Sequence, residues 1–420
     1  MYVLSILVAI NFLNYLDRYL PAAAAPAIQA EFHLNDFQIG LLGTAFLLVY
    51  ALAMLPMGLW ADRGLRKAVI GTGVAIWSVA TLFTGLSRSY LQLLITRGVL
   101  GIGEASYFPA GTALLGDLWP KHLRARVIAF RDAGSVIGIA TGYVGGGIVA
   151  ELYGWRSAFY FTAVPGLLLA LLVISIREPL RGQAEPRGPK LAHVADARLE
   201  AFKQLWTGIP TLRATILSQI LLFWVLGGLS TFLPLLVNRR FGLGIAASAT
   251  VGGGVLIAGG LVGTFLGGWL GDWRARRSAR GHLQVGAAGF VLGALFVVLA
   301  LLAPSLGLFV VFGLLAAVSL YLYSAPFTAL AQNIVVPSMR ASAITLTLLV
   351  GHLFGDAWSP TALGALSDAV HSLPLAVGLT CPLVLVGAAA LATVGFGTAQ
   401  QDTEAMEETW ARHPSEPAPA

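Results

Sequence analysis

Long runs of apolar residues, separated by short polar segments, occupy most of this chain. Twelve of the runs are long enough to cross the hydrocarbon core of a bilayer as an α-helix, which takes about 20 residues. In chain order these spans 1 to 12 are residues 3–27, 39–61, 68–87, 90–116, 127–150, 157–176, 211–237, 246–271, 283–303, 306–332, 340–366 and 373–397. The pattern predicts an all-α integral membrane protein.

Two sets of six spans follow one another along the chain. A polar segment that contains prolines and charges separates them, and an acidic, then proline-rich tail follows span 12. We therefore predict an N-terminal six-helix bundle at 1–176, a cytoplasmic linker at 177–210, a C-terminal six-helix bundle at 211–397 and a disordered cytoplasmic tail at 398–420. Within the linker, residues 195–206 can form an amphipathic helix on the membrane surface or remain a solvated loop.

Composition supports exposure to lipid rather than to water. Apolar residues make up 57% of the chain and charged residues 11%, against about a quarter charged in a soluble domain. The net charge of +6 comes from residues scattered over short loops, so no nucleic-acid partner is expected. The single cysteine, Cys381, excludes a disulfide framework and a Cys-based metal site. Span 1 begins at Tyr2 without a basic leader, which predicts a transmembrane helix and not a cleaved signal peptide.

Basic residues are distributed unequally between the connecting segments. Most Lys and Arg side chains follow even-numbered spans, whereas the loops after odd-numbered spans hold Arg88, Arg156, Arg239 and Arg240. The positive-inside rule therefore places the linker and both termini in the cytoplasm. The few lysines and the many Ala and Gly residues suggest a GC-rich bacterial source, so the expected location is the bacterial inner (cell) membrane.

A short motif at the end of span 2 is repeated at the end of span 8. Residues 58–67 (GLWADRGLRK) correspond to residues 268–277 (GWLGDWRARR), each with an aspartate four positions after the first glycine and basic residues behind it. Two copies that lie six helices apart predict two pseudo-symmetric bundles. In such duplicated architectures the substrate site lies near the midplane of the membrane, between the two halves.

With this loop motif, the chain resembles the major facilitator superfamily over essentially its whole length. The resemblance implies that Asp62 and Arg66, together with Asp117, latch the two halves on the cytoplasmic side. A salt bridge that caps the loop is the alternative, and the two roles are compatible.

Span 1 carries charged and amide side chains, which are costly inside a bilayer and therefore indicate function. Asn14 lies three residues before Asp17 and four before Arg18, so all three can share one helix face or its edges. We expect this face to line a cavity, because lipid would not tolerate it. Asp17 is the best candidate proton carrier, since burial and a nearby arginine can bring its titration into a transport cycle. The alternative is a permanently charged Asp17 in a structural ion pair.

Span 4 contains Arg97 and Glu104, which lie two helical turns apart on one face, at a spacing of about 10 Å. They form a charge chain with Asp17 if spans 1 and 4 face each other, as the resemblance implies. Glu104 is then a second proton-coupling group, and Arg97 a cation whose partner changes on protonation. A closed ion-pair network that fixes helix packing is the alternative. Arg131 and Asp132, near the cytoplasmic end of span 5, are assigned to structure or to the cytoplasmic gate.

The second half offers one ionisable pair and several weakly polar side chains to the same cavity. His352 and Asp356 are four residues apart in span 11. Histidine titrates near physiological pH, which suggests a role in substrate binding or gating, although a histidine that only packs is the alternative. Tyr321 and Tyr323 join them as candidate cavity residues. A cavity that is polar on one wall and apolar on the other suits an amphiphile.

Three segments taken together are similar to the spinster lipid transporters. They are Asn14–Tyr19 in span 1, Arg97–Tyr107 in span 4 and His352–Pro360 in span 11. The resemblance implies a transporter that moves lysophospholipids or sphingoid lipids by alternating access. It uses the proton gradient as its energy source and needs no bound cofactor. Its partners are the lipid substrate, protons and the bilayer, and we expect a monomer.

The spinster resemblance also implies roles for individual residues. Proton coupling falls to Asp17 and Glu104, while Arg18 and Arg97 tune these acids or meet the anionic head group. The substrate cavity is assigned to Asn14, Tyr107, Tyr321, Tyr323, His352 and Asp356.

Two other functions are weighed against lipid transport. A carrier of small organic anions or a drug efflux pump would have the same fold, and organic-anion carriers share the segment in span 1. A membrane-embedded lipid enzyme would need a nucleophile with a base, or a metal site. The histidines are scattered, however, and none lies in a metal-binding or Gly-x-Ser-x-Gly context. We therefore predict a secondary active transporter without a catalytic or metal site.

Overall fold

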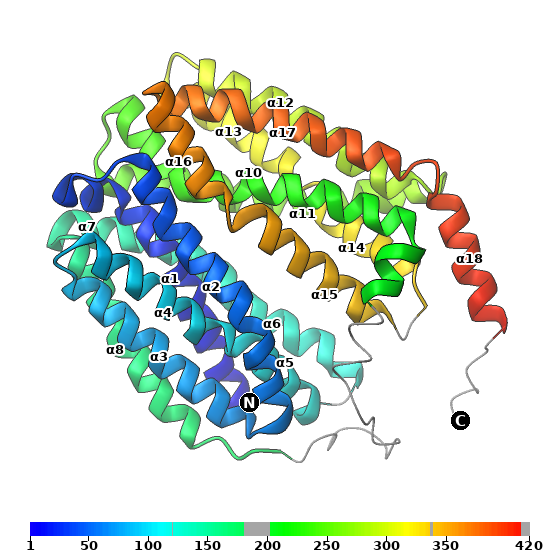
Figure 1. The fold of residues 1–420 in the computed structure, drawn as a ribbon, viewed down its shortest axis with the longest axis horizontal. Coiled ribbons are helices and arrows are strands. Elements are labelled where there is room, and N and C mark those ends of the chain that lie inside the picture. Colours follow the sequence, from blue (N-terminus) through cyan, green and yellow to red (C-terminus); the bar gives the residue numbers. More distant parts are fainter. Residues whose placement is uncertain (120, 180–201, 337–338, 413–420) are drawn as a thin grey trace. The chain divides into compact units, whose positions relative to one another are not determined.

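The computed structural model describes residues 1–119, 121–179, 202–336 and 339–412, and all regular secondary structure in these ranges is helical (Figure 1). The first half contains α1 (Tyr2–Phe32), α2 (Asp36–Arg63), α3 (Arg66–Leu86), α4 (Tyr90–Ala105), α5 (Tyr107–Leu118), α6 (Lys121–Ala140), the π-helical turn η1 (Thr141–Gly145), α7 (Gly146–Tyr153) and α8 (Trp155–Ile174). The second half contains α10 (Pro210–Phe241), α11 (Ile245–Ala275), α12 (Gly281–Leu302), α13 (Leu306–Tyr321), α14 (Ser324–Asn333), α15 (Arg340–Gly351), the π-helical turn η3 (His352–Asp356), α16 (Ser359–Val370), α17 (Leu373–Val394) and α18 (Ala399–Arg412).

Every predicted span corresponds to one helix or to consecutive helices. Among the described residues, ten helical segments are long and apolar enough to cross a membrane. The other two predicted spans, 4 and 11, are also helical but are divided. Span 4 breaks at Ser106, between α4 and α5, and span 11 is divided into α15, η3 and α16. The prediction of an all-α membrane protein with twelve spans is confirmed.

The interruptions repeat with the same period of six spans as the loop motif. Span 4 is divided into α4 and α5, and span 10 into α13 and α14. Span 5 contains η1 between α6 and α7, and span 11 contains η3 between α15 and α16. A π-helical turn is rare and is often kept for a functional reason. The presence of such a turn in both span 5 and span 11 supports the predicted duplication independently of the loop motif.

Two compact units describe the packing, and their limits differ from the predicted bundles. Unit 1 comprises Met1–Lys190, Gly227–Ile257 and Asp356–Ala376, and unit 2 comprises Leu191–Leu226, Ala258–Gly355 and Val377–Ala420. Unit 1 therefore contains the first six spans together with the end of α10, the start of α11 and α16.

Close helix contacts hold unit 1 together. Helix α1 packs along α6 and η1, α2 packs along α4 and α16, and α3 packs along α4 and α8. Glycines in α6 permit the first of these contacts. A Cβ atom added at Gly134 or Gly138 would lie 2.8 or 2.3 Å from the carbonyl oxygen of Val8 or Phe12 of α1. Such distances exclude any side chain without a shift of the backbone.

Unit 2 combines glycine contacts with an aromatic core. Cβ atoms added at Gly263 and Gly267 of α11 would lie 2.3 and 2.2 Å from backbone carbonyl oxygens of the α13 region. Tyr323 packs with its ring centroid 5.8 Å from that of Phe327 and 6.0 Å from that of Phe290. These edge and tilted contacts are typical of buried aromatic clusters.

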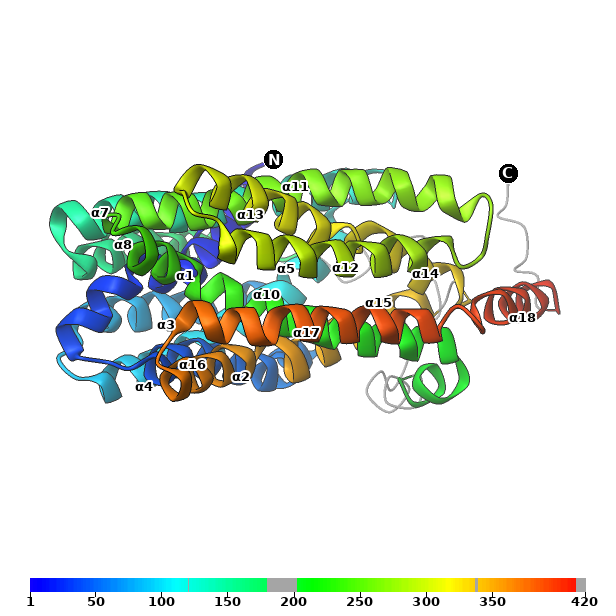
Figure 2. The ribbon, with the colours of Figure 1, turned by 90° about the horizontal axis from the view of Figure 1, so that it is seen from above.

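Residues 399–412 form helix α18, which corrects the prediction of a disordered tail for this part of the chain. The helix follows directly after α17 (Figure 2). The Asp402 carboxylate accepts a hydrogen bond of 2.8 Å from the Thr211 N–H, and the Thr211 and Thr398 hydroxyls are 2.7 Å apart. Asp402 thus satisfies an N–H group in the first turn of α10, and this contact anchors α18. Residues 413–420 lie outside the described residues.

Only the two ends of the predicted linker are described. Glu178 and Pro179 follow α8, and residues 202–208 are helical. The alternatives for 195–206, an amphipathic helix or a solvated loop, fall largely on residues outside the described ranges.

Candidate functional site

The structure brings four predicted charges together inside unit 1. The side chains of Asp17, Arg97 and Glu104 are almost completely buried, with 1%, 3% and 1% of each residue exposed. Arg18 donates a hydrogen bond of 3.1 Å from Nη2 to Oε2 of Glu104. Two acids and two guanidinium groups therefore share a region in which an unpaired charge is costly.

Aromatic rings surround the Arg18 guanidinium. Its Cζ atom lies 5.0 Å from the ring centroid of Tyr15, 5.2 Å from that of Phe46 and 4.8 Å from that of Tyr50. Cation–π contacts of this kind replace part of the hydration that the guanidinium loses on burial. Phe46 and Tyr50 were not among the predicted site residues. Their signal in the sequence is an aromatic pair four residues apart, which places both rings on one face of α2.

Arg97 is the least satisfied of the four charged groups. Its Cζ atom lies 4.9 Å from the Phe46 ring centroid, but Nε and Nη1 have no hydrogen-bond partner among the described residues. Glu104, Asp17 and Arg18 are close enough to interact with it electrostatically. A cation with unused donors and two nearby acids can change partners without a large movement.

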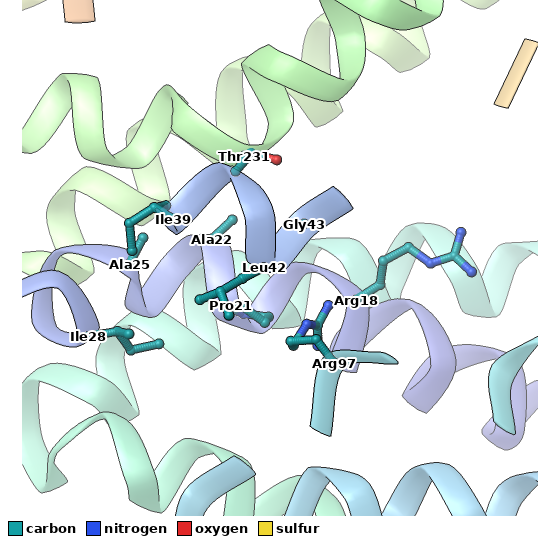
Figure 3. A pocket seen from close by; sticks show the side chains of 10 residues that line it. All are labelled: Arg18, Pro21, Ala22, Ala25, Ile28, Ile39, Leu42, Gly43, Arg97 and Thr231. Carbon is teal, nitrogen blue, oxygen red and sulfur yellow. The ribbon is translucent and has the colours of Figure 1, made fainter. Parts of the chain in front are cut away.

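Arg18 and Arg97 form one end of a pocket between α1, α2, α4 and α10. The remaining walls are small or apolar, apart from one threonine (Figure 3). The complete lining is Arg18, Pro21, Ala22, Ala25, Ile28, Ile39, Leu42, Gly43, Arg97 and Thr231. In Figure 3 both guanidinium groups lie on one side of the pocket, and Ala25, Ile28 and Ile39 lie on the other. The cavity volume is about 50 Å³. The lining residues fit a ligand in which an anionic group lies next to an apolar group.

Asp17 occupies a different side of α1 from Arg18, which corrects the expectation that both line one cavity. The hydroxyl of Thr81 on α3 lies 3.4 Å from Oδ2 of Asp17, and Thr162 of α8 also interacts with this carboxylate. Neither Asp17 nor Asn14 lines the pocket. Neighbouring residues of an α-helix point about 100° apart, so Arg18 can reach the pocket while Asp17 faces α3 and α8.

At the cytoplasmic end of the predicted topology, Arg66 is the centre of a charged cluster. Its guanidinium pairs with Asp117 through Nη1 and with Oε1 of Glu178 through Nε at 2.9 Å. The predicted Arg66–Asp117 pair is therefore present. Asp62 lies in the last turn of α2, and its side chain is outside the described part of the structure.

Glu178 is a member of this cluster that the sequence analysis missed. Its carboxylate accepts hydrogen bonds from the backbone N–H groups of Arg66 and Lys67, both at 3.0 Å, and so caps the start of α3. Partial burial raises the pKa of Glu178, but these donors and the Arg66 guanidinium outweigh it and hold the pKa below the usual range. The carboxylate therefore stays ionised at neutral pH and keeps its ion pair with Arg66.

Arg131 is buried, with 2% of the residue exposed. Its guanidinium donates to Oδ1 of Asp132 at 2.8 Å and to the hydroxyl of Thr112 on α5 at 2.6 Å, and it lies 5.0 Å from the Phe108 ring centroid. Arg131 and Asp132 thus form the predicted neighbouring pair, and Arg131 ties α6 to α5.

Two predicted cavity tyrosines lie in hydrophobic cores instead. Tyr107 is 2% exposed, and its hydroxyl donates a hydrogen bond of 2.6 Å to the Leu7 carbonyl of α1. Tyr323 belongs to the aromatic core of unit 2. Both side chains point into helix–helix contacts, because a tyrosine ring buries a large apolar area and needs one partner for its hydroxyl.

The other second-half candidates lie at or next to helix interruptions. Tyr321 is the last residue of α13, and its ring faces Gly260 of α11. His352 and Asp356 are the first and last residues of η3. The His352 ring centroid lies 5.0 Å from that of Phe223 on α10.

Comparison with known proteins identifies the family. A model described as the Major Facilitator Superfamily matches residues 7–360. The protein spinster homolog 1 of Bos taurus is 30% identical over 391 residues, which cover 87% of this chain and 72% of the relative. The sphingosine-1-phosphate transporter SPNS2 of Xenopus tropicalis is 29% identical over 399 residues, which cover 90% of this chain and 77% of that one.

A solved structure agrees with these relatives. It is described as a bacterial homolog to the human lysosomal transporter spinster in an inward-facing and unoccupied conformation. It matches with a TM-score of 0.80 and 26% sequence identity over 99% of this chain and 98% of that chain. The predicted major facilitator fold and the predicted spinster resemblance are both confirmed. This chain is an integral membrane protein that belongs to the major facilitator superfamily and, within it, to the spinster type of transporters.

Proposed function

We propose that this protein is a proton-coupled secondary transporter that carries a lipid with an anionic head group across the bacterial inner membrane by alternating access. A lysophospholipid or a sphingoid lipid fits this description. One observation carries the proposal. A pocket has Arg18 and Arg97 at one end and walls that are otherwise apolar apart from Thr231, and it lies next to the buried acids Asp17 and Glu104. The protein uses the proton gradient and no bound cofactor. Both termini face the cytoplasm.

Charge balance explains how a proton and an anionic head group favour each other's binding. With both acids ionised, the four charges Asp17, Arg18, Arg97 and Glu104 sum to zero. A proton on either acid leaves a net charge of +1, and one negative charge from a head group restores neutrality. Because an uncompensated charge is costly at this depth, protonation and anion binding stabilise one another. The unused donors of Arg97 are available for the head group.

The size of the pocket argues for alternating access. A volume of about 50 Å³ holds about two water molecules and is too small for a lipid chain. Lipid transport therefore requires a wider conformation, in which helices that line the pocket separate. The similarity to a relative named as a sphingosine-1-phosphate transporter supports a lipid with a negatively charged head.

A small organic anion is the second candidate, because the two arginines that line the same pocket can bind a carboxylate. Such an anion meets the two arginines without an apolar chain to accommodate. This alternative predicts transport of short carboxylates or sugar acids and no effect of chain length.

Transport by the purified protein in liposomes tests both candidates. With an imposed pH gradient, we expect labelled lysophospholipid to move faster than without one, and Asp17→Asn to remove this acceleration. Glu31→Gln is the matched control, because Glu31 is also paired with an arginine, Arg156, but lies outside the buried cluster. Lipid movement that ignores the gradient would exclude proton coupling. Movement of organic anions but not of lysolipids would favour the second candidate.

A further inference from the structure

Two carboxylates cap helix N-termini at the end of unit 1 that holds the α1–α2 turn. Asp368 of α16 accepts hydrogen bonds from the N–H groups of Asp36 at 2.9 Å and Phe37 at 2.8 Å, the first two residues of α2. Glu151 of α7 accepts one from the N–H of Ala246 at 2.6 Å, the second residue of α11. N-terminal N–H groups have no partner within their own helix, so both contacts satisfy otherwise free donors.

The two caps are related by the six-span duplication. Helix α7 ends span 5 and α16 ends span 11, while α2 is span 2 and α11 is span 8. Glu151 lies two residues before the end of α7 at Tyr153, and Asp368 lies two residues before the end of α16 at Val370. The same kind of contact therefore occurs twice. A helix of the second half, α16, caps α2 of the first half, and a helix of the first half, α7, caps α11 of the second half.

Backbones approach closely next to both caps. A Cβ atom added at Gly364 of α16 would lie 2.2 Å from the Asp36 carbonyl oxygen, and one at Gly40 of α2 would lie 2.1 Å from that of Pro360. Next to the Glu151 cap, a Cβ atom added at Gly147 of α7 would lie 2.8 Å from the Cβ atom of Ala249 of α11. Helices from the two halves are thus in direct contact at this end of unit 1.

An additional ion pair reinforces the Asp368 side. The Asp36 carboxylate, 5% exposed, accepts two hydrogen bonds from Arg239 of α10, at 2.8 and 2.5 Å. It also accepts one from Ser367 Oγ at 2.5 Å and one from Gln29 Nε2 at 3.0 Å. Charge-assisted bonds to a planar guanidinium are among the stronger contacts in proteins. The α2–α16 contact should therefore be harder to open than the α7–α11 contact.

These contacts lie next to the apolar end of the pocket that contains Arg18 and Arg97. Ile28 and Ile39 line that pocket, and they flank the segment that contains Gln29 at the end of α1, the α1–α2 turn and Asp36 at the start of α2. A substrate that enters or leaves the pocket past this turn has to separate α2 from α16, or α7 from α11.

The geometry points to Asp368 and Glu151 as a pair of latches that close the non-cytoplasmic entrance of the transport pathway, with the Asp36–Arg239 ion pair strengthening the Asp368 latch. The inference rests on the alternating access of the proposed function. Both caps break each time the pathway opens to this side and form again when it closes.

Accessibility of a pocket residue from the non-cytoplasmic side tests the latches. Ala25→Cys, in a chain with Cys381→Ala, places the reporter thiol in the pocket, and a membrane-impermeant maleimide is applied from that side. We expect Asp368→Ala to raise the labelling rate about tenfold and Glu151→Ala about threefold, in line with the loss of two and of one helix-capping hydrogen bonds. Glu31→Gln should leave the rate unchanged, because Glu31 accepts its hydrogen bonds from Trp155 and Arg156 of the first half only. Equal rates in all these variants would overturn the proposal.

A cross-link provides a second test that does not depend on how well the alanine variants fold. Phe37→Cys with Asp368→Cys places the two cysteines at the contact where the Asp368 carboxylate now meets the α2 amide, so that a disulfide between them would tie α2 to α16. We expect oxidation to block labelling of the pocket from the non-cytoplasmic side and to stop transport, and reduction to restore both. Unchanged labelling in the oxidised protein would refute the latch. Because labelling needs no substrate and no pH gradient, it separates failure of the latch from failure of the proposed lipid transport.

Discussion

Removal of the Glu104 charge should turn the buried cluster into a permanent anion site. Glu104→Gln keeps the size of the side chain and an oxygen acceptor for Arg18, but it deletes one of the two negative charges. Arg18 and Arg97 then exceed the acids by one charge, as they do in the protonated state. The variant is therefore expected to be less stable without ligand and more strongly stabilised by an anionic lipid than the wild type.

The magnitude follows from the contacts of Arg18. At 3.1 Å between Nη2 and Oε2, the attraction is about 5 kcal/mol at an effective dielectric constant of about 20. Loss of one partner from a buried ion pair costs about 3–5 kcal/mol. The three aromatic rings within 5.2 Å of the guanidinium still stabilise the unpaired Arg18 charge by about 1–2 kcal/mol, which offsets part of this cost. We therefore expect a net destabilisation of about 2–3 kcal/mol.

Thermal unfolding in detergent, followed by tryptophan fluorescence, measures this effect. The unfolding temperature of Glu104→Gln should lie several degrees below that of the wild type. An anionic lysolipid should recover most of the difference, whereas a zwitterionic lysolipid of equal chain length should recover little. Glu31→Gln removes an exposed carboxylate from an arginine pair and should change neither quantity. The reasoning is refuted if Glu104→Gln is as stable as the wild type and gains no more from the anionic lipid.

Three further changes test other parts of the structure. Asp17→Asn removes the buried proton acceptor, so a pH gradient should no longer accelerate lipid flux in liposomes, while lipid exchange without a gradient continues. Retained acceleration would exclude Asp17 as the coupling group. Glu178 has a lowered pKa, so its carboxylate stabilises the cluster around Arg66 above the ordinary glutamate pKa of about 4.3. This contribution disappears as the pH falls through the lowered value. Glu178→Gln should accordingly lose less stability than the wild type between neutral and acid pH in thermal unfolding; equal losses would contradict this assignment. Gly138→Ala brings a methyl group to 2.3 Å from the Phe12 carbonyl oxygen and should destabilise by about 1–3 kcal/mol, whereas Gly116→Ala, with nothing within 4 Å of the added atom, should be neutral.

Much of the fold follows from local properties of the sequence. The length and apolarity of the runs predict the spans, because a helix in lipid has to satisfy its backbone internally and hide few charges. The repeated loop motif predicts the duplication, which the interruptions in spans 4 and 10 and in spans 5 and 11 repeat. The tail is the exception. Its polar composition suggests disorder, but Asp402 and Thr398 contact the start of α10 and favour a helix.

The candidate site could be predicted in part. Helical spacing and the cost of buried charge single out Asp17, Arg18, Arg97 and Glu104, and the structure brings them together. Spacing along one helix does not show which neighbour a face meets, however. Tyr107, predicted to line the cavity, instead bonds to the Leu7 carbonyl.

The sequence by itself determined the class of protein, the number of spans and the buried charges, because each depends on the hydrophobicity and period of one segment. Only the tertiary structure decided which charges face the pocket and which distant groups pair with one another. Asp36 meets Arg239 and Asp368 across more than 200 and 330 residues of chain, and Arg66 meets Glu178 across 112. Such contacts depend on how each helix is rotated and packed, and no local pattern in the sequence records that rotation.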